Sequence, residues 1–186
     1  MTYSGVRESA IELLTEWDAP DAGQDALRQA VLGFLLARTD SCERACVPGH
    51  ITASALVVSD SGDEVLLTLH PRLGRWVQLG GHCEPEDTDI VAAAMREATE
   101  ESGIEGLRID ASLGAIHVHA LTCSLGVPTR HLDLQFIARA PADAAIAISD
   151  ESLDLRWWPV DALPEGIDTA VAHLVAVGRS RQMSDE

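Results

Sequence analysis

Glu97, Glu100 and Glu101 form an acidic cluster near the middle of the chain. Their spacing of i, i+3 and i+4 would place all three on one face of a helix, with Cβ atoms roughly 5–6 Å apart. Carboxylates this close repel one another, and in the last turn of a helix they also face the negative end of the helix dipole. Because a bound cation reverses the sign of both energies, the cluster indicates a metal site.

The residues around the cluster predict the helix that would position it. Asp87 or Thr88 is a suitable N-cap, the interior is rich in alanine, and Gly103 stands where a C-terminal cap belongs. Gly80 and Gly81 come before the helix, and glycines suit a tight turn and let the backbone approach a ligand. A solvated acidic face is the alternative interpretation, but it gives no reason for the flanking glycines.

The segment 80–104 resembles the signature of the Nudix hydrolases. That signature reads glycine, five residues, Glu, seven residues, Arg-Glu, an apolar residue, any residue, Glu-Glu, any residue, glycine and an apolar residue. Residues 96–104 match its second half, with Ala98 at the apolar position. The first half differs, because its early acid is an aspartate, Asp87, and one extra residue follows that acid. The role of the early acid stays open between Asp87, Glu86 and neither of them.

The resemblance covers about two thirds of the chain and implies an α/β/α sandwich with a mixed β-sheet. The implied activity is hydrolysis of a diphosphate linkage in a nucleoside diphosphate linked to another group, by water attack on phosphorus. Mg²⁺ is the implied cofactor and Mn²⁺ the alternative, since both accept a few carboxylates together with substrate phosphates. The implied metal ligands are the Gly80 carbonyl, Glu97, Glu100 and Glu101. The implied catalytic residues are Glu100, Glu101, Glu151 and Arg96, of which Arg96 is expected to orient Glu97.

Two later segments supply the other candidates. His119, His131 and Asp133 are expected to line the substrate pocket, because the corresponding strand pair borders the substrate in the family that the chain resembles. Alternate strand residues point to the same face, so His117 and His119 could instead hold a second metal with His131. Glu151 lies in a segment similar to a recurrent late part of the family, where it is a candidate base or metal partner against an ordinary loop acid.

The first 49 residues predict an N-terminal helical extension. Amphipathic patterns at 6–17 and 26–35 flank a break at 19–23, which indicates a helical hairpin. This hairpin is expected to pack either against the catalytic domain or against a second subunit, the latter as a homodimer. Residues 50–186 are expected to form the Nudix domain. Its predicted strands are 51–58, 65–69, 76–79, 107–110, 115–121 and 131–138, and its predicted closing helix is 167–179.

The composition limits the partners. The 186 residues carry a formal charge of −17, from thirty acids against thirteen Lys and Arg. Such a surface repels nucleic acids and anionic membranes, and a phosphorylated substrate would need a metal or a local basic patch. Neither an apolar run of membrane-span length nor a signal-peptide pattern is present in the sequence. The expected partner is a small phosphorylated molecule, with no nucleic-acid polymer and no membrane, and the expected location is the cytoplasm.

The four cysteines, Cys42, Cys46, Cys83 and Cys123, lack a convincing zinc spacing and are expected to be reduced, partly buried thiols. Two other functions remain open. A degenerate Nudix domain would bind a nucleotide or a protein without cleaving anything, and the altered loop favours it. An isomerase on the same scaffold would need a catalytic cysteine with a glutamate, and Cys83 has no evident partner.

Overall fold

The computed structural model describes residues 3–122, 126–150 and 152–182. Its elements, in chain order, are α1 (Ser4–Glu16), α2 (Ala22–Ala37), β1 (His50–Val58), β2 (Glu64–His70), β3 (Arg75–Val77), β4 (Leu79–His82), α3 (Ile90–Ser102), β5 (Arg108–Thr122), β6 (Pro128–Arg139), β7 (Leu155–Pro159) and α4 (Thr169–Gln182). None of the helices in these ranges combines the length and the apolar character that a membrane span requires.

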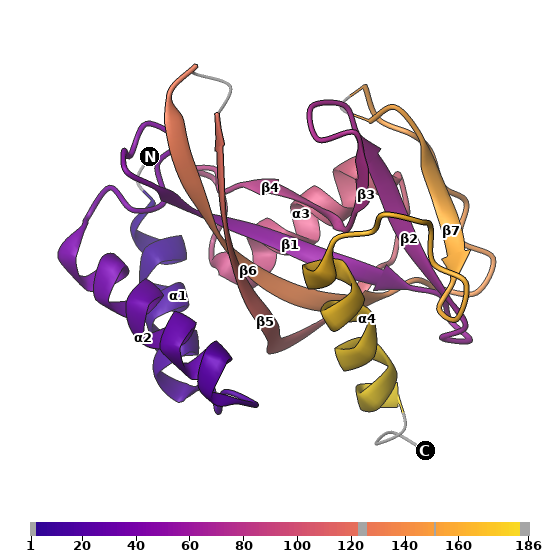
Figure 1. Ribbon diagram of the computed structural model, residues 1–186, viewed down its shortest axis with the longest axis horizontal. Coiled ribbons are helices and arrows are strands. Elements are labelled where there is room, and N and C mark those ends of the chain that lie inside the picture. The colour runs from indigo at the N-terminus through magenta and orange to yellow at the C-terminus, as the bar shows by residue number, and fades with distance from the viewer. Residues whose placement is uncertain (1–2, 123–125, 151, 183–186) are drawn as a thin grey trace.

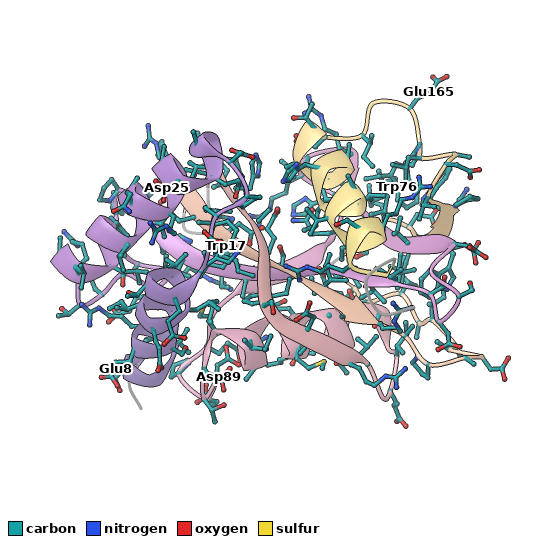
Figure 2. The ribbon with its side chains drawn as sticks, turned by 90° about the horizontal axis from the view of Figure 1, so that it is seen from below. Glu8, Trp17, Asp25, Trp76, Asp89 and Glu165 are labelled. Carbon is teal, nitrogen blue, oxygen red and sulfur yellow. The ribbon has the colours of Figure 1, made fainter. Side chains whose placement is uncertain are left out.

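The described strands form one seven-stranded sheet with the order β3-β2-β1-β6-β5, while β4 pairs with β1 and β7 pairs with β2 (Figure 1). The sheet is mixed, because β1 runs parallel to β6 and antiparallel to β2 and β4. Figure 2 shows α4 on one side of the sheet and α3 on the other. This arrangement confirms the predicted α/β/α sandwich.

The central strand β1 has two different faces. Its odd-numbered residues, from Ile51 to Val57, are apolar and belong to the buried cluster that includes Ala94 and Ala98 of α3. On the other face, Leu56 and Val58 pack with residues of α4. The even-numbered residues that precede them on that face are polar and buried, namely His50, Thr52 and Ser54. The buried strand predicted at 51–58 is confirmed, and one of its faces carries these polar side chains.

The N-terminal helices contribute to the same core. Buried side chains of α1 and α2, which are Val6, Ala10, Leu14, Val31 and Leu35, belong to the cluster that contains Ile90 and Ala94 of α3. Arg7 of α1 donates hydrogen bonds to the carbonyls of Leu35 and Arg38, which joins α1 to the end of α2. The two N-terminal helices thus share a core with α3, while the domain boundary after residue 49 and the homodimer stay predictions.

Helix α1 also contacts the N-terminus of α3. Ser9 Oγ accepts a hydrogen bond from the backbone N–H of Ile90 at 2.9 Å. Gly5 allows the approach, since a Cβ at this position would lie 2.5 Å from the carbonyl oxygen of Thr88. Figure 2 shows Asp89, the N-cap of α3, at the end of α3 that faces α1. An N-terminal N–H of a helix normally needs such an acceptor, so Ser9 acts as a cap supplied from another element.

Replacement of Ser9 by alanine is therefore expected to lower the free energy of unfolding by about 1 kcal/mol, because the N–H of Ile90 loses its acceptor. Denaturant unfolding followed by circular dichroism measures this difference. The matched control is Thr15→Ala in the same helix, because the exposed Thr15 hydroxyl bonds only within α1, to Ile11. Equal losses in the two variants would contradict a capping role for Ser9.

Several element boundaries differ from the prediction. The predicted N-cap of α3, Asp87 or Thr88, is wrong, because Asp89 has the extended backbone and accepts from Ala92 N–H. The predicted strand 76–79 is two strands, since β3 pairs with β2 and β4 pairs with β1. The two strands predicted at 107–121 are one strand, β5, with an irregular register between Asp110 and Ala115. The C-terminal cap is confirmed, because Gly103 has the left-handed backbone, with φ of 67°.

Candidate active site

Helix α3 holds two of its acids against the glycine pair of β4. Glu101 is 8% exposed, and its Oε2 accepts a hydrogen bond from the N–H of Gly80 at 2.9 Å. The carboxylate of Glu97 lies against Gly81, where a Cβ would come within 2.7 Å of Oε1. Because Glu97 and Glu101 are one helical turn apart, both carboxylates meet the same short strand. The glycines are thus required for the close approach of the acids.

Gly80 also packs closely on β1. A Cβ at Gly80 would lie 2.3 Å from Ser54 Cβ and 2.7 Å from the carbonyl oxygen of Ala53. The backbone of Gly80 has φ of 153°, a value that residues with a side chain rarely adopt. A side chain is therefore excluded both by space and by backbone conformation.

Arg96 links the acids of the helix to the loop before it. Its guanidinium forms two hydrogen bonds with Asp87, at 2.9 and 3.0 Å, and its Nη1 lies 3.1 Å from both Glu97 Oε1 and Glu100 Oε2. The hydrogen bonds to Asp87 and the nearby carboxylates raise the pKa of Arg96 above its ordinary value. The repulsion within the acidic cluster is therefore weaker than predicted, because Arg96 lies between Glu97 and Glu100 and offsets their charge.

Asp87 and Glu86, the two alternatives for the early acid, differ clearly in the structure. The side chain of Asp87 is only 4% exposed, and besides binding Arg96 it accepts a hydrogen bond from the N–H of Glu84 at 2.7 Å. Glu86 is exposed. Asp87 is therefore the acid that ties the loop to the helix.

Asp133 is at the centre of a buried polar network on the α4 side of the sheet. Its carboxylate accepts hydrogen bonds from Thr52 Oγ1 at 2.9 Å, Ser54 Oγ at 2.7 Å, Gln78 Nε2 at 3.3 Å and Gln135 Nε2 at 3.0 Å. Four donors satisfy a buried charge well. Since Ser54 packs on Gly80, this network adjoins the glycine pair. The predicted contact of Asp133 with substrate stays a prediction.

The predicted histidines lie next to two others on the same part of the sheet. The His119 and His131 rings are 5.2 Å apart between centroids, and His117 stacks on His119 at the same distance. His50 and His82 flank His131, with ring centroids 4.9 Å from it. Burial lowers the pKa of His82 to about 3 and that of His131 to about 4, so both imidazoles are neutral at pH 7.

Glu151 and the four cysteines are the remaining candidates. Glu151 lies outside the described residues, and so does Cys123. Cys42, Cys46 and Cys83 are buried, free thiols. A hydrogen bond with Cys42, together with burial, raises the pKa of Cys83, so this thiol is not an activated nucleophile.

Sequence reasoning missed five polar residues, which are His50, Thr52 and Ser54 of β1, Gln78 between β3 and β4, and His82 of β4. One signal was present, because His50, Thr52 and Ser54 alternate with apolar residues and period-two alternation places them on one face. No local signal could find Gln78 or His82, since their partners come from strands distant in the sequence.

If Glu97 binds Mg²⁺, as the sequence predicts, replacement of Gly81 by alanine should weaken that binding about tenfold or more, because the added methyl group displaces the Glu97 carboxylate. Gly81 does not have a positive φ, so its backbone accepts alanine without strain. Calorimetric titration with Mg²⁺ measures the effect. The matched control is Gly33→Ala in α2, where nothing lies within 4 Å of the added Cβ. Unchanged Mg²⁺ affinity in Gly81→Ala would show that Glu97 is not a metal ligand.

Solved structures of similar fold have been found for most of the chain. The C. elegans Ap4A hydrolase in a binary complex is 22% identical, with 73% of this chain and 98% of that chain covered and a TM-score of 0.55. A UDP-X diphosphatase is 15% identical, with 95% and 93% covered and a TM-score of 0.54. The E. coli dihydroneopterin triphosphate pyrophosphohydrolase is 21% identical, with 69% and 92% covered and a TM-score of 0.54. At these identities the likeness shows the fold.

A search of the curated proteins found no match. The family model described as NUDIX domain, however, matches residues 48–176. This range is more than half of the chain, and it includes α3, the glycine pair and all the strands of the sheet. The chain therefore belongs to the Nudix hydrolase family.

Proposed function

We propose that the protein is a divalent-metal-dependent pyrophosphohydrolase that cleaves a diphosphate linkage in a nucleotide or a nucleotide derivative. The observation that carries this proposal is the placement of Glu97 and Glu101 against Gly81 and Gly80. Two carboxylates held against the same short strand form a preorganised set of oxygen ligands.

The residues present fit Mg²⁺ or Mn²⁺. The available donors around the glycine pair are carboxylate and carbonyl oxygens, which hard divalent ions prefer. Glu97 and Glu101 are the first proposed ligands, and Glu100 and the Gly80 carbonyl are the next. The Glu100 side chain is exposed and makes only a surface ion pair with Arg96, so it can turn toward a bound metal ion at low cost. When bound, such an ion neutralises the diphosphate and lowers the pKa of a coordinated water.

The chain's own residues would prepare this chemistry. Arg96 fixes the position of the Glu97 carboxylate through the contact at 3.1 Å and is itself held by Asp87. We assign Arg96 the role of a positioning residue, since three acids and the carbonyl of His82 occupy its guanidinium. Glu100 and Glu101 are the proposed catalytic carboxylates, and Glu151 stays a further candidate.

The substrate is proposed to lie over the polar side of the sheet. A cavity of about 170 Å³ is lined there by His117 and Gln135, together with Thr169 and His173 of α4. Gln135 also donates to Asp133, so one lining residue belongs to the network that adjoins Gly80. His119 and His131 stand on the same pair of strands. The shared strands and the bond between Gln135 and Asp133 support the proposed pocket role of the two histidines and of Asp133.

A local positive charge would offset the acidic surface. Arg44 and Arg72 are exposed, and their charges contribute, after burial, to the lowered pKa of His82. His82 follows the glycine pair directly, so both charges act on a residue next to the proposed diphosphate site. We propose that they attract the anionic substrate despite the net charge of −17. Buried, free thiols fit a reducing compartment, which supports the proposed cytoplasmic location.

The two alternatives are less well supported. In an isomerase Cys83, which follows His82 at the end of β4, would have to react, but it is 3% exposed and its pKa is raised. A binding module that cleaves nothing is favoured only by the altered loop. The loop nevertheless holds Asp87 on Arg96, so the positions of the helix acids do not depend on an unaltered loop.

A substrate panel tests the proposal. The three similar proteins are named for Ap4A, UDP derivatives and dihydroneopterin triphosphate, so these compounds belong in the panel beside nucleoside triphosphates and nucleoside diphosphate sugars. The protein is incubated with each compound and Mg²⁺ or Mn²⁺, and the products are identified by mass. Cleavage of a diphosphate linkage is expected for at least one compound. Metal binding without cleavage of any compound would favour the binding module.

A further inference from the structure

Three histidines from three adjacent strands converge on one point of the sheet. His50 is on β1, His82 on β4 and His131 on β6, and β1 is the strand that pairs with both others (Figure 1). One ligand atom of each lies within 4.8 Å of the other two. The ring centroids are 5.0 Å apart for His50 and His82 and 4.9 Å apart for the other two pairs.

Two of these side chains present unpaired nitrogen atoms. Within the described part of the chain, Nε2 of His50 and Nε2 of His131 are buried and have no hydrogen-bond partner. His50 is 0% exposed, so water cannot easily replace the missing partner. A buried polar atom without a partner destabilises the folded state, so its presence calls for a ligand.

The orientation of His50 fits a metal ligand. Its Nδ1 lies 3.4 Å from the carbonyl oxygen of Cys46, a position from which an N–H would donate to that oxygen. The proton would then be on Nδ1, and Nε2 would carry a free lone pair. Metal-bound histidines characteristically donate their other N–H to a backbone carbonyl or a carboxylate in this way. His131 is near the buried carboxylate of Asp133, which favours a positive charge.

We propose that His50, His82 and His131 form a second metal site, which binds a transition-metal ion of the Zn²⁺ type and is separate from the carboxylates of α3. Three neutral imidazoles favour Zn²⁺, Co²⁺ or Ni²⁺ over Mg²⁺, which prefers oxygen ligands. The set differs from the predicted one, since His117 and His119 are replaced by His50 and His82.

The site would link β4, the strand of the glycine pair, to its neighbours β1 and β6. In a tetrahedral site with metal–nitrogen bonds of about 2.0–2.1 Å, the three nitrogen atoms are about 3.4 Å apart. Binding therefore draws the rings together by rotation about their side-chain torsions, and it leaves the fourth position to water. Arg44 and Arg72 are exposed, so solvent screens their repulsion of the ion. The bound ion would hold β4, which contains Gly80 and Gly81, in a fixed position relative to β1 and β6.

Titration with Co²⁺ tests the site. For this titration the protein is prepared without an affinity tag and freed of metal with a chelator, which is then removed. Excess Mg²⁺ is added to occupy oxygen sites. We expect one Co²⁺ per chain, with the intense visible d–d absorption of four-coordinate Co²⁺. His82→Gln and His131→Gln should each lose this absorption. His173→Gln is the matched control, since His173 is exposed on α4, and Glu101→Gln is the second control. Both should retain it.

The contrary results are equally specific. Absence of the absorption in the wild type, its retention in both His82→Gln and His131→Gln, or its loss in Glu101→Gln would each overturn the proposal. Thiolate-to-metal charge transfer would also overturn it, because it would identify the cysteines as ligands. X-ray absorption of the Zn²⁺-loaded wild type gives a test without mutants, with scattering from about three imidazoles expected. No substrate is used, so the result is independent of the proposed function.

Discussion

Replacement of Glu101 by glutamine is expected to lower turnover by ~100-fold or more while the fold is retained. Loss of a metal ligand costs more than loss of a residue that supports one, for which about 10–100-fold is typical. Glutamine has nearly the same size, and its side-chain oxygen can still accept the hydrogen bond from Gly80 N–H. The unfolding midpoint without metal should therefore stay close to that of the wild type.

The measurement is the steady-state rate with the best compound of the panel, beside thermal unfolding in chelator. Glu105→Gln is the matched control, because it removes the same charge from an exposed position shortly after α3. Its rate should stay within about twofold of the wild type, as for an ordinary surface change. A Glu101→Gln enzyme with the activity of the control would remove Glu101 from the metal site.

Replacement of Arg96 by glutamine is expected to lower the free energy of unfolding by about 3 kcal/mol. The change leaves the carboxylate of Asp87, which is 4% exposed, without its partner, and removes the charge between Glu97 and Glu100. Breaking a buried pair from one side typically costs about 3–5 kcal/mol, and the lower end applies because Arg96 is 19% exposed.

Denaturant unfolding measures this loss, and a double-mutant cycle with Asp87→Asn separates the pair from other contacts. Asp87→Asn in the Arg96→Gln background should cost less than in the wild type, since the unpaired charge is already the main penalty. Arg38→Gln is the matched control, because its ion pair with Asp40 is exposed on both sides and should contribute little to stability. Equal losses for Arg96→Gln and Arg38→Gln would show that the Asp87 pair has no structural importance.

The parts of the site that local rules govern could be predicted from the sequence. Helical spacing placed Glu97 and Glu101 on one face, and both meet β4. Gly103 is the C-cap because a left-handed residue is needed there. The N-cap was wrong because Asp87, equally suitable by type, is engaged by Arg96 nine residues later in the chain. A local preference cannot decide between two aspartates when a tertiary ion pair takes one of them.

The sheet shows the limit of sequence reasoning more clearly. His117 and His119 are neighbours by strand alternation alone, and they are indeed stacked. The group of His50, His82 and His131 depends instead on which strands pair and in which register. A shift of one residue in β4 would turn His82 to the other face of the sheet. Pairing of distant strands is a property of the whole fold, so only the structure could bring these histidines together.

The Mg²⁺ dependence of diphosphate cleavage in the wild type, Glu97→Gln and Glu101→Gln tests the central claim most directly. With the best compound of the panel, the wild-type rate should rise with Mg²⁺ to saturation and vanish in chelator, because the same carboxylates hold the ion and the reacting water. Both variants should lose cleavage together with the Mg²⁺ response. Wild-type cleavage without a divalent metal, or an undiminished Mg²⁺ response in both variants, would contradict the assignment of the active site to α3 and β4.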